Sequence, residues 1–154
     1  FPLSSVVFSF INTIFSIIAI FIIVILTGGK VYLTFLFIPL ILFYLFLFSL
    51  GFGMILASIS VFFRDVTHLY NIFLTLIMYL TPIFYPENII PKSYKSLISL
   101  NPLLHYVKYF RKIVFEGVFP NITLNITCFV IGVVTLFIGV LVFKKKENEF
   151  VLYV

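Results

Sequence analysis

The sequence predicts an all-α fold, a polytopic helical membrane protein, and three observations support this class. Hydrophobic residues make up 63% of the 154 residues and charged residues only 10%, against averages of about 45–50% and about 25% in soluble domains. Four apolar stretches each reach or nearly reach the roughly 20 residues that cross a bilayer. They lack the period-two alternation of barrel strands, so helices are expected to satisfy the backbone in lipid.

The expected spans divide the chain into four apolar segments and one more polar region. The spans cover about residues 6–26, 31–63, 67–84 and 122–143, and re-entrant or interfacial helices are expected over 85–121. Residues 1–154 are treated as a single transmembrane domain. Because neither a methionine nor a signal-peptide pattern stands at the start of the chain, we expect this domain to be truncated at its N-terminus.

Polar side chains recur at helical spacing within the first and third expected spans. In the first span they are Ser5, Ser9, Asn12 and Ser16, and in the third span they are Thr67, Asn71, Thr75 and Tyr79. Two interpretations are open: hydrogen bonds between packed helices, or faces that line a polar substrate path. The candidate path residues are Ser9, Asn12, Ser16, Asn71, Thr75 and Tyr79.

The second expected span is longer than a bilayer requires, so it must tilt, kink at Pro39 or extend beyond the membrane. Small residues at helical spacing in this span predict that another helix approaches it closely. They are Ser49, Gly53, Ala57 and Ser60. The last span carries a similar seam formed by Gly132, Thr135 and Gly139.

One charge pair stands between the second and third expected spans. Arg64 and Asp65 are the only charged residues between Lys30 and Glu87, and such a pair indicates contact with water. It is either a surface ion pair that ends two helices or a docking contact for a cytosolic partner.

The third expected span breaks at Thr81-Pro82-Ile83-Phe84-Tyr85-Pro86, since two prolines four residues apart stop a helix. Non-helical backbone at membrane depth must be covered by protein or line a cavity. A re-entrant turn or gate is therefore expected here.

A helix is expected to begin at Asn101-Pro102, which is an N-cap followed by proline at the first helical position. Gly117 would end it. One face would carry His105, Lys108, Lys112 and Glu116, and the opposite face Leu103, Val107, Phe110 and Val114. This pattern is typical of an amphipathic helix at a membrane interface.

The lysine triplet 144–146 after the last span favours a cytosolic C-terminus. Arg64 would then be cytosolic and region 85–121 external. Counting Lys and Arg opposes this orientation, with four inside and six outside. We still prefer it, because the truncated part would contribute to topology and an interfacial helix binds headgroups on either face.

The net charge, the single cysteine and the lack of a phosphate-binding loop argue against several kinds of functional site. The net charge of +5 lies beside the spans, so lipid headgroups are expected as partners and nucleic acid is not. Cys128 alone provides neither a disulfide nor a metal site. No Gly-rich phosphate-binding loop occurs, so ATP hydrolysis is not expected in this chain. We expect no catalytic residue, metal or cofactor.

The spaced motifs resemble the membrane subunit of type-2 ABC transporters, and most nearly the bacterial exporters of polysaccharides and polyol phosphates. The motifs are Leu50-Gly51-Phe52-Gly53-Met54-Ile55-Leu56-Ala57, Phe63-Arg64-Asp65-Val66, the proline-broken segment 81–86, Ile90-Pro91, Asn101-Pro102 and Tyr109-Phe110-Arg111. Together they cover nearly the whole chain. The resemblance also supports the preferred orientation.

This resemblance implies a permease with six spans in the full chain, embedded in the bacterial inner membrane. It implies a permease homodimer and a separate ABC ATPase subunit that carries ATP and Mg. The substrate would be a lipid-linked glycan, that is, a polysaccharide or polyol phosphate of the O-antigen, capsule or teichoic acid type. Arg64 and Asp65 would lie near the ATPase, and an external gate would include Pro82, Phe84, Tyr85, Pro86, Asn101 and Pro102.

Three alternatives remain. One is an ABC exporter of drugs or peptides, and a second is a non-catalytic membrane assembly subunit. A third is a membrane-embedded transferase using His68, His105, Asp65 or Glu87. The transferase lacks an evident nucleophile beside these residues.

Overall fold

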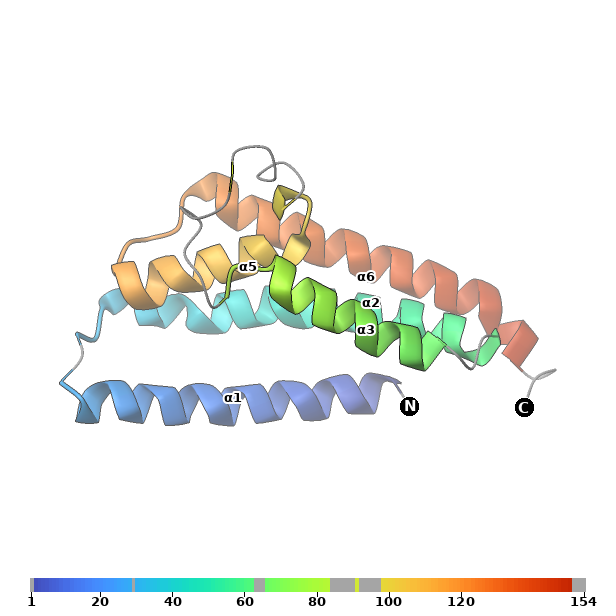
Figure 1. Ribbon diagram of the computed structural model, residues 1–154, viewed down its shortest axis with the longest axis horizontal. Helices are drawn as coiled ribbons and strands as arrows, with labels where there is room; N and C mark the ends of the chain where they lie inside the picture. Colours follow the sequence, from blue (N-terminus) through green and yellow to red (C-terminus); the bar gives the residue numbers. More distant parts are fainter. Residues whose placement is uncertain (1, 29, 63–65, 84–90, 92–97, 151–154) are drawn as a thin grey trace.

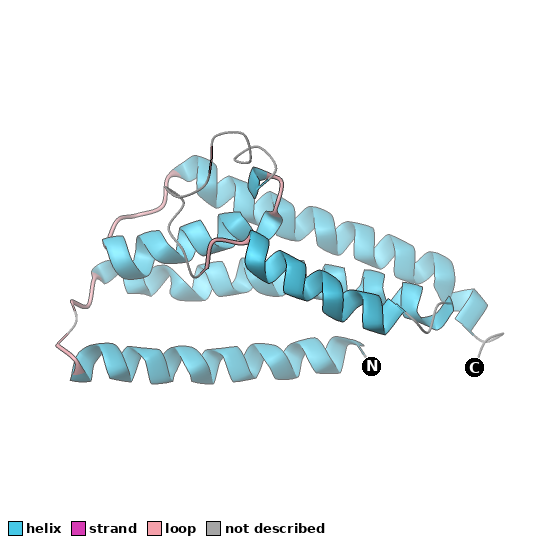
Figure 2. Ribbon diagram, viewed as in Figure 1, coloured by secondary structure: helices cyan, strands magenta, loops and turns pink. Residues whose placement is uncertain are grey.

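The computed structural model describes residues 2–28, 30–62, 66–83, 91 and 98–150, and every structural statement below refers to these residues. They form a bundle of helices without strands (Figure 1, Figure 2). The elements are α1 (Pro2–Leu26), the 3₁₀ helix η1 (Leu33–Phe37), α2 (Ile38–Phe62), α3 (Val66–Leu80), α5 (Pro102–Arg111), the π-helix η3 (Lys112–Glu116) and α6 (Ile122–Phe150).

Three helical segments within the described residues are long and apolar enough to cross a membrane. They are Ser4–Leu26, Leu33–Val61 and Ile122–Lys146. The helical membrane class is therefore confirmed, and these three segments coincide with three of the expected spans. The fourth is different, because α3 has only 15 residues, fewer than the roughly 20 that a bilayer requires.

The early end of α3 has a local cause. Proline disfavours helical backbone at the residue before it, so Pro82 limits the helix. The last backbone hydrogen bond of this helix joins the Thr81 amide to the Ile77 carbonyl at 2.8 Å. Within the described residues the fourth expected span thus corresponds to a shorter apolar helix.

The second expected span is also not one uniform helix. Residues 33–37 form a 3₁₀ helix, and α2 then begins at Ile38, so Pro39 lies in its first turn. A proline there removes an amide that has no partner within the helix. Pro39 therefore fits the start of α2 and does not interrupt its interior.

The centre of the bundle is the close packing of α2 on α6, which lie side by side along its length (Figure 1). A Cβ added to Gly139 would collide with backbone atoms of Gly51, and one added to Gly51 would collide with the backbone of Thr135 and Leu136. The small-residue seam predicted in the last span therefore packs against another helix. The lack of a side chain at Gly139 and at Gly51 lets the two backbones approach.

On α2, the glycine that packs against α6 is Gly51, which the predicted stripe did not include. Gly53 of that stripe instead approaches α1, where an added Cβ would lie 3.3 Å from Val6 Cγ2. The stripe predicted close helix approach but did not include the glycine of α2 that lies against the backbone of α6. Periodicity gives several small-residue faces on α2, and only packing selects among them.

Helix α5 packs on both α2 and α6. Its expected start is confirmed, because Asn101 Oδ1 accepts a hydrogen bond from the Leu103 amide at 3.0 Å and Pro102 follows. Gly117, at φ +63°, follows η3 in the left-handed conformation that suits glycine.

The buried face of this helical segment differs from the predicted one. The buried side chains are Leu104, Tyr106, Tyr109 and Ile113. The side chains predicted to form the apolar face are only partly buried; they are Leu103, Val107, Phe110 and Val114. The most buried side chains are thus offset from the predicted apolar face, because tyrosine rings provide much of the packing.

Candidate functional site

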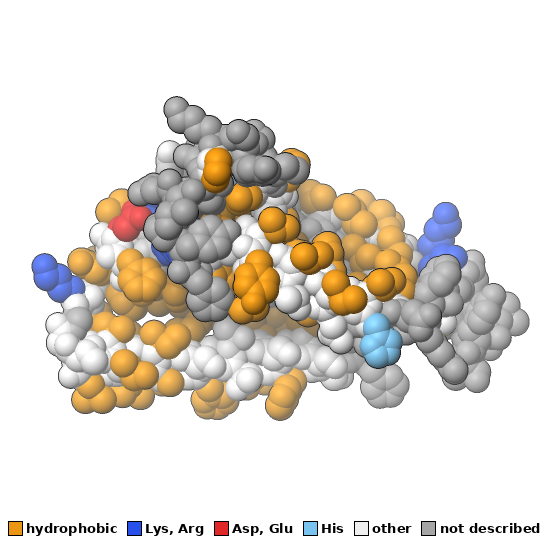
Figure 3. All heavy atoms as spheres, viewed as in Figure 1, with side chains coloured by type: hydrophobic (Ala, Val, Ile, Leu, Met, Phe, Trp, Pro, Cys, Tyr) orange, Lys and Arg blue, Asp and Glu red, His pale blue; other side chains and the backbone are white. Residues whose placement is uncertain are grey.

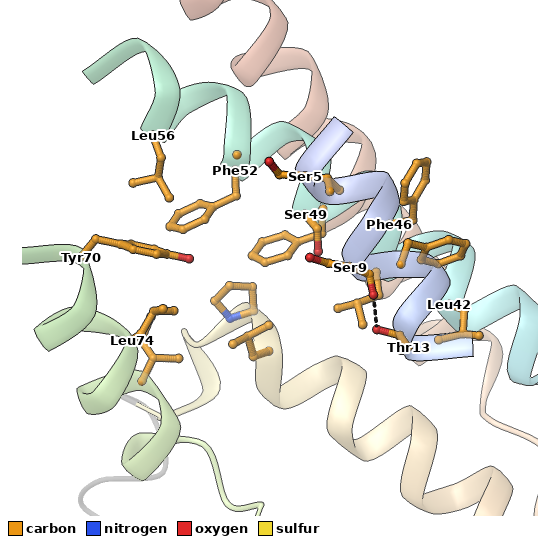
Figure 4. Close-up of a pocket in the computed structure, with 18 of the residues that line it drawn as sticks. Ser5, Ser9, Thr13, Leu42, Phe46, Ser49, Phe52, Leu56, Tyr70 and Leu74 are labelled. Atoms are coloured by element: carbon orange, nitrogen blue, oxygen red, sulfur yellow. Dashed lines mark hydrogen bonds between the residues drawn. The ribbon is translucent and has the colours of Figure 1, made fainter. Parts of the chain in front are cut away.

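A cavity of about 480 Å³ lies between α1, α2, α3 and the start of α5 (Figure 4). Its lining is mostly apolar and contains no charged side chain. The Tyr70 side chain extends from α3 into the cavity, while Ser9 from α1 and Ser49 from α2 lie on the other side (Figure 4). Asn101 and Pro102, at the start of α5, also line the cavity.

The α1 wall includes the predicted path residue Ser9 but not Asn12 or Ser16. Its members are Ser5, Val6, Ser9, Phe10 and Thr13. The Thr13 hydroxyl donates to the Ser9 carbonyl at 2.8 Å, and the Ser16 hydroxyl donates to the Asn12 carbonyl at 3.0 Å. Two of the polar side chains on α1 therefore bond within their own helix.

The predicted polar stripe of α3 does not line this cavity. Helix α3 contributes Tyr70, Phe73, Leu74 and Ile77. The other side of the helix exposes Asn71, Thr75 and Tyr79, and the Thr75 hydroxyl donates to the Asn71 carbonyl at 2.9 Å. Their role in a substrate path stays a prediction, and this intramolecular cavity does not include them.

The segment after α3 is fastened to α5 by two hydrogen bonds. The Asn101 side-chain amide donates to the Thr81 hydroxyl at 2.7 Å, and the Arg111 guanidinium donates to the Ile83 carbonyl at 2.9 Å. Thr81 is 1% exposed, and Pro82 beside it is fully buried. The structure thus places Thr81, the neighbour of Pro82, against Asn101 of the predicted gate.

Several predicted residues lie outside the described part of the chain. Phe84, Tyr85 and Pro86 of the predicted gate are among them, as are Arg64 and Asp65 of the elbow. Their proposed roles therefore rest on the sequence.

Three side-chain hydrogen bonds join the helices around α5. The Tyr106 hydroxyl donates to the Cys128 carbonyl of α6 at 3.0 Å, and the Thr34 hydroxyl of η1 donates to the Ile113 carbonyl at 2.7 Å. The Tyr44 hydroxyl of α2 donates to Asn125 Oδ1 of α6 at 2.8 Å. Sequence reasoning missed these residues, although the hydroxyl of a buried tyrosine usually has a hydrogen-bond partner.

Tyr109 occupies the same buried cluster, and its ring meets that of Tyr44 edge-on at 6.5 Å. Burial, with smaller contributions from Tyr44 and Cys128, raises the pKa of Tyr109 to about 12, and burial also raises the pKa of Tyr106. Within the described residues, no hydrogen-bond partner reaches the Tyr109 hydroxyl. Both phenols therefore stay neutral at physiological pH. Their rings contribute to the packing of the buried cluster.

Charged side chains lie toward the ends of the bundle, while the visible flank is largely apolar (Figure 3). Lys144, Lys145 and Lys146 lie near the C-terminal end of α6, and Lys108, Arg111 and Lys112 lie on α5 and η3. Within the described part of the chain, no three His, Cys, Asp or Glu side chains are grouped to hold a metal ion. The described site is thus a cavity between membrane helices.

The chain is similar in sequence to proteins named for the export or transport of polysaccharides. The O-antigen export system permease protein RfbA of Klebsiella pneumoniae is 27% identical over 104 residues, which are 68% of this chain and 40% of that protein. The protein of the same name from Myxococcus xanthus is 32% identical over 105 residues, 67% of this chain and 40% of that protein.

The polysialic acid transport protein KpsM of Escherichia coli is 31% identical over 101 residues, 65% of this chain and 39% of that protein. The chain thus spans about two fifths of the length of the curated relatives that it matches. The family model described as ABC-2 type transporter matches residues 1–115. Since this match covers most of the chain and the helices are those of a membrane protein, the chain belongs to the ABC-2 type transporter family.

Proposed function

We propose that the chain forms part of the permease subunit of an ATP-driven exporter in the bacterial inner membrane. Its substrate would be a lipid-linked polysaccharide or polyol phosphate of the O-antigen, capsule or teichoic acid type. The observation that carries this proposal is the family match over residues 1–115, together with relatives named for O-antigen export and polysialic acid transport. The relatives' names favour a glycan substrate over a drug or peptide.

ATP hydrolysis is assigned to a separate ABC ATPase subunit that binds ATP and Mg. The chain lacks the glycine-rich loop that cradles nucleotide phosphates, and its relatives are named as permease and transport proteins. The permease would therefore provide the membrane passage and respond to movements of its partner.

The elbow at Arg64 and Asp65 is proposed to face this ATPase. Helix α2 ends and α3 begins at the same end of the bundle as the C-terminal end of α6, where the lysine triplet lies (Figure 1). Clustering of these lysines next to a span favours the cytosolic side. This arrangement supports a cytosolic position for the elbow.

The opposite half of the bundle is proposed to carry the external gate. The chain leaves α3 at the buried Pro82 and enters α5 at Asn101 and Pro102. Helix α5 packs on the spanning helices α2 and α6. Hydrogen bonds from Asn101 and Arg111 fasten the segment after α3 to α5. Such a covered break is what non-helical backbone between membrane spans requires.

Two copies of the permease are proposed to form the complete passage, with the glycan moving between them. The exposed stripe Asn71, Thr75 and Tyr79 on α3 would then face that passage. Its polar groups lie on the surface of the described chain and away from the intramolecular cavity. This position is compatible with a path that a second copy completes.

The proposal is tested by purifying the full-length parent protein in mild detergent and identifying its companions by mass spectrometry. A stoichiometric ABC ATPase would support the exporter, whereas its reproducible absence would favour an assembly subunit. In parallel, deletion of the gene should remove the surface polymer and leave its lipid-linked form inside the cell. Normal surface polymer with increased drug sensitivity would instead favour the drug exporter.

A further inference from the structure

The helical segment that follows the proposed gate ends in a turn of unusual register. Helix α5 continues directly into η3, a single π-helical turn over Lys112–Glu116. Backbone hydrogen bonds in a π-helix join residues five positions apart, against four in an α-helix, so this turn holds an additional residue. Such turns are rare and occur frequently at functional sites. The contacts around η3 show what selects this register.

The carbonyl of Ile113, within η3, is not used by the two backbone amides that could continue the helix. An α-register would pair it with the Gly117 amide, and a continued π-register would pair it with the Val118 amide. Both amides instead donate to the carbonyl of Lys112. Because a buried carbonyl without a donor is unfavourable, Ile113 needs a partner from elsewhere in the chain.

Thr34 provides that partner. Its hydroxyl donates to the Ile113 carbonyl at 2.7 Å, although Thr34 lies in η1, in the connection between α1 and α2. Thr34 is 2% exposed and Ile113 is fully buried among the described residues, so the contact is complete without other parts of the protein. Thr34 thus satisfies the carbonyl that the register of η3 leaves open.

Two aromatic rings from the same connection contact the residues after η3. The ring of Tyr32 lies against Gly117, where an added Cβ would collide with it. The ring of Phe37 meets that of Phe119 edge-on, with the ring centroids 5.3 Å apart. A change of η3 to the α-register would turn Gly117 and Phe119 by about 100° relative to α5, the rotation of one helical position. Both ring contacts therefore also depend on the register of η3.

Helix α5 is itself joined to the segment after α3. Asn101 donates to the Thr81 hydroxyl, and Arg111 donates to the Ile83 carbonyl. The connection between α1 and α2 lies at the same end of the bundle as η3 (Figure 1). Helix α5 with η3 therefore links the segment after α3 to the connection between α1 and α2.

We propose that Thr34 is a positioning residue for the external gate. Its bond to the Ile113 carbonyl keeps η3 in the π-register, and loss of this bond lets η3 adopt the α-register, in which the Gly117 amide replaces Thr34 on that carbonyl. This change rotates α5 relative to the residues after η3, and the hydrogen bonds of α5 pass the rotation to the segment after α3. The inference rests on the proposed exporter and its gate.

The register is measured by crosslinking in membranes that contain the full-length protein with its natural partner subunits. Cysteines replace Phe37 and Phe119, and a short bifunctional thiol reagent joins them, while the native Cys128 is buried. Without this ring pair the register depends more strongly on Thr34. Crosslinking should be several-fold slower in Thr34→Val, which keeps the side-chain shape but not the donor, and should recover in Thr34→Ser. Equal rates with and without the hydroxyl would overturn the proposal.

Export is measured as the amount of surface polymer at matched membrane abundance. Thr34→Val should lose most export while the partner subunits still co-purify, and Thr34→Ser should retain it. The matched control is Thr27→Val, because the Thr27 hydroxyl donates to carbonyls of the adjacent helix α1 at 2.8 and 3.2 Å. A role in stability alone would lower abundance and leave export per molecule unchanged, and that result would overturn the proposal.

A deletion tests the register without changing Thr34. Removing Phe115, which is 73% exposed, shortens η3 by one residue, so an α-turn can span the same ends. This variant should also lose most export at normal abundance. Full export by the deletion variant would overturn the proposal.

Failure of the gate role and failure of the exporter give different results. Crosslinking that depends on Thr34, together with full export by Thr34→Val and by the Phe115 deletion, would overturn the gate role and leave Thr34 as a structural contact. Unchanged surface polymer after deletion of the whole gene would overturn the exporter and with it the gate role. The crosslinking rates would still report the register in that case.

Discussion

The side-chain amide of Asn101 donates a 2.7 Å hydrogen bond to the hydroxyl of Thr81, which lies 20 positions earlier in the chain. The same Asn101 side chain accepts from the Leu103 amide and so caps α5. Thr81 in turn donates to the Ile77 carbonyl at 2.7 Å. The end of α3 and the start of α5 are thus joined through two adjacent polar side chains.

Removing this contact should destabilise the protein by about 0.5–1.5 kcal/mol, the usual contribution of one hydrogen bond. Thr81→Val removes the acceptor, and Asn101→Ala removes both the donor and the helix cap. Asn101→Asp keeps a cap oxygen for Leu103 but loses the amide donor. Detergent-solubilised full-length variants would be compared by denaturant unfolding, with the Thr81→Val/Asn101→Ala double variant completing the cycle. Strict additivity would mean that the contact contributes nothing.

Crosslinking across this contact should also block export, if the segment after α3 moves during transport. Cysteines would replace Thr81 and Asn101, and a short thiol crosslinker would join them in membranes. We expect loss of surface polymer with the ATPase subunit still bound, measured by surface staining and co-purification. Each single-cysteine variant treated with the same reagent is the control. Full export through a verified crosslink would remove the gate assignment.

The two buried tyrosines of α5 should respond differently to loss of their hydroxyls. Tyr106→Phe loses the bond to the Cys128 carbonyl and should cost roughly 0.6 kcal/mol, the average for hydrogen bonds between membrane helices. Tyr109→Phe should be neutral or stabilising, because a buried hydroxyl without a partner is unfavourable. The measurement is the unfolding midpoint of each variant. A larger loss for Tyr109→Phe than for Tyr106→Phe would contradict this assignment.

The glycine contact between α2 and α6 should tolerate no side chain. Gly139→Ala would place a methyl group against the backbone of Gly51, and such overpacking costs about 1–3 kcal/mol. Gly53→Ala is the matched control, since its Cβ would meet only the side chain of Val6, at 3.3 Å. Protein abundance in membranes and thermal stability in detergent would be compared. Equal behaviour of the two variants would show that the close contact is not required.

Replacement of the elbow charges should lower export without removing the protein from the membrane. The sequence motivates this prediction, since Arg64 and Asp65 are isolated charges within an apolar region. Arg64→Ala and Asp65→Ala would be assayed for surface polymer and for membrane abundance. His68→Ala, a change three positions after Asp65, serves as the control. Full export by both charge variants at normal abundance would favour the assembly subunit.

Local signals in the sequence predicted several features of the site. Asn101 followed by Pro102 located the start of α5, and Gly117 located the end of η3, which continues from α5, because caps depend on a few adjacent residues. Pro82 indicated where α3 stops. The length of α3 was overestimated, since an apolar composition continues past the point where backbone geometry ends the helix.

Contacts between distant segments could not be predicted in the same way. The bond from Tyr106 to the Cys128 carbonyl spans 22 positions, and the bond from Thr34 to the Ile113 carbonyl spans 79. The sequence contains the hydroxyl groups but no local pattern that identifies their acceptors. The polar stripes were likewise real features of α1 and α3, yet only Ser9 of the predicted path residues lines the cavity.

The sequence by itself determined that this chain is a helical membrane protein, where most helices begin and end, and which family motifs it carries. Tertiary structure alone decided that Gly51 meets Gly139, that the tyrosines of α5 are buried, and that a cavity separates α1 from α3. The physical reason is that lipid chains are as apolar as the helix surfaces. Hydrophobic pattern therefore places a helix in the membrane, while close packing and hydrogen bonds choose which face meets another helix.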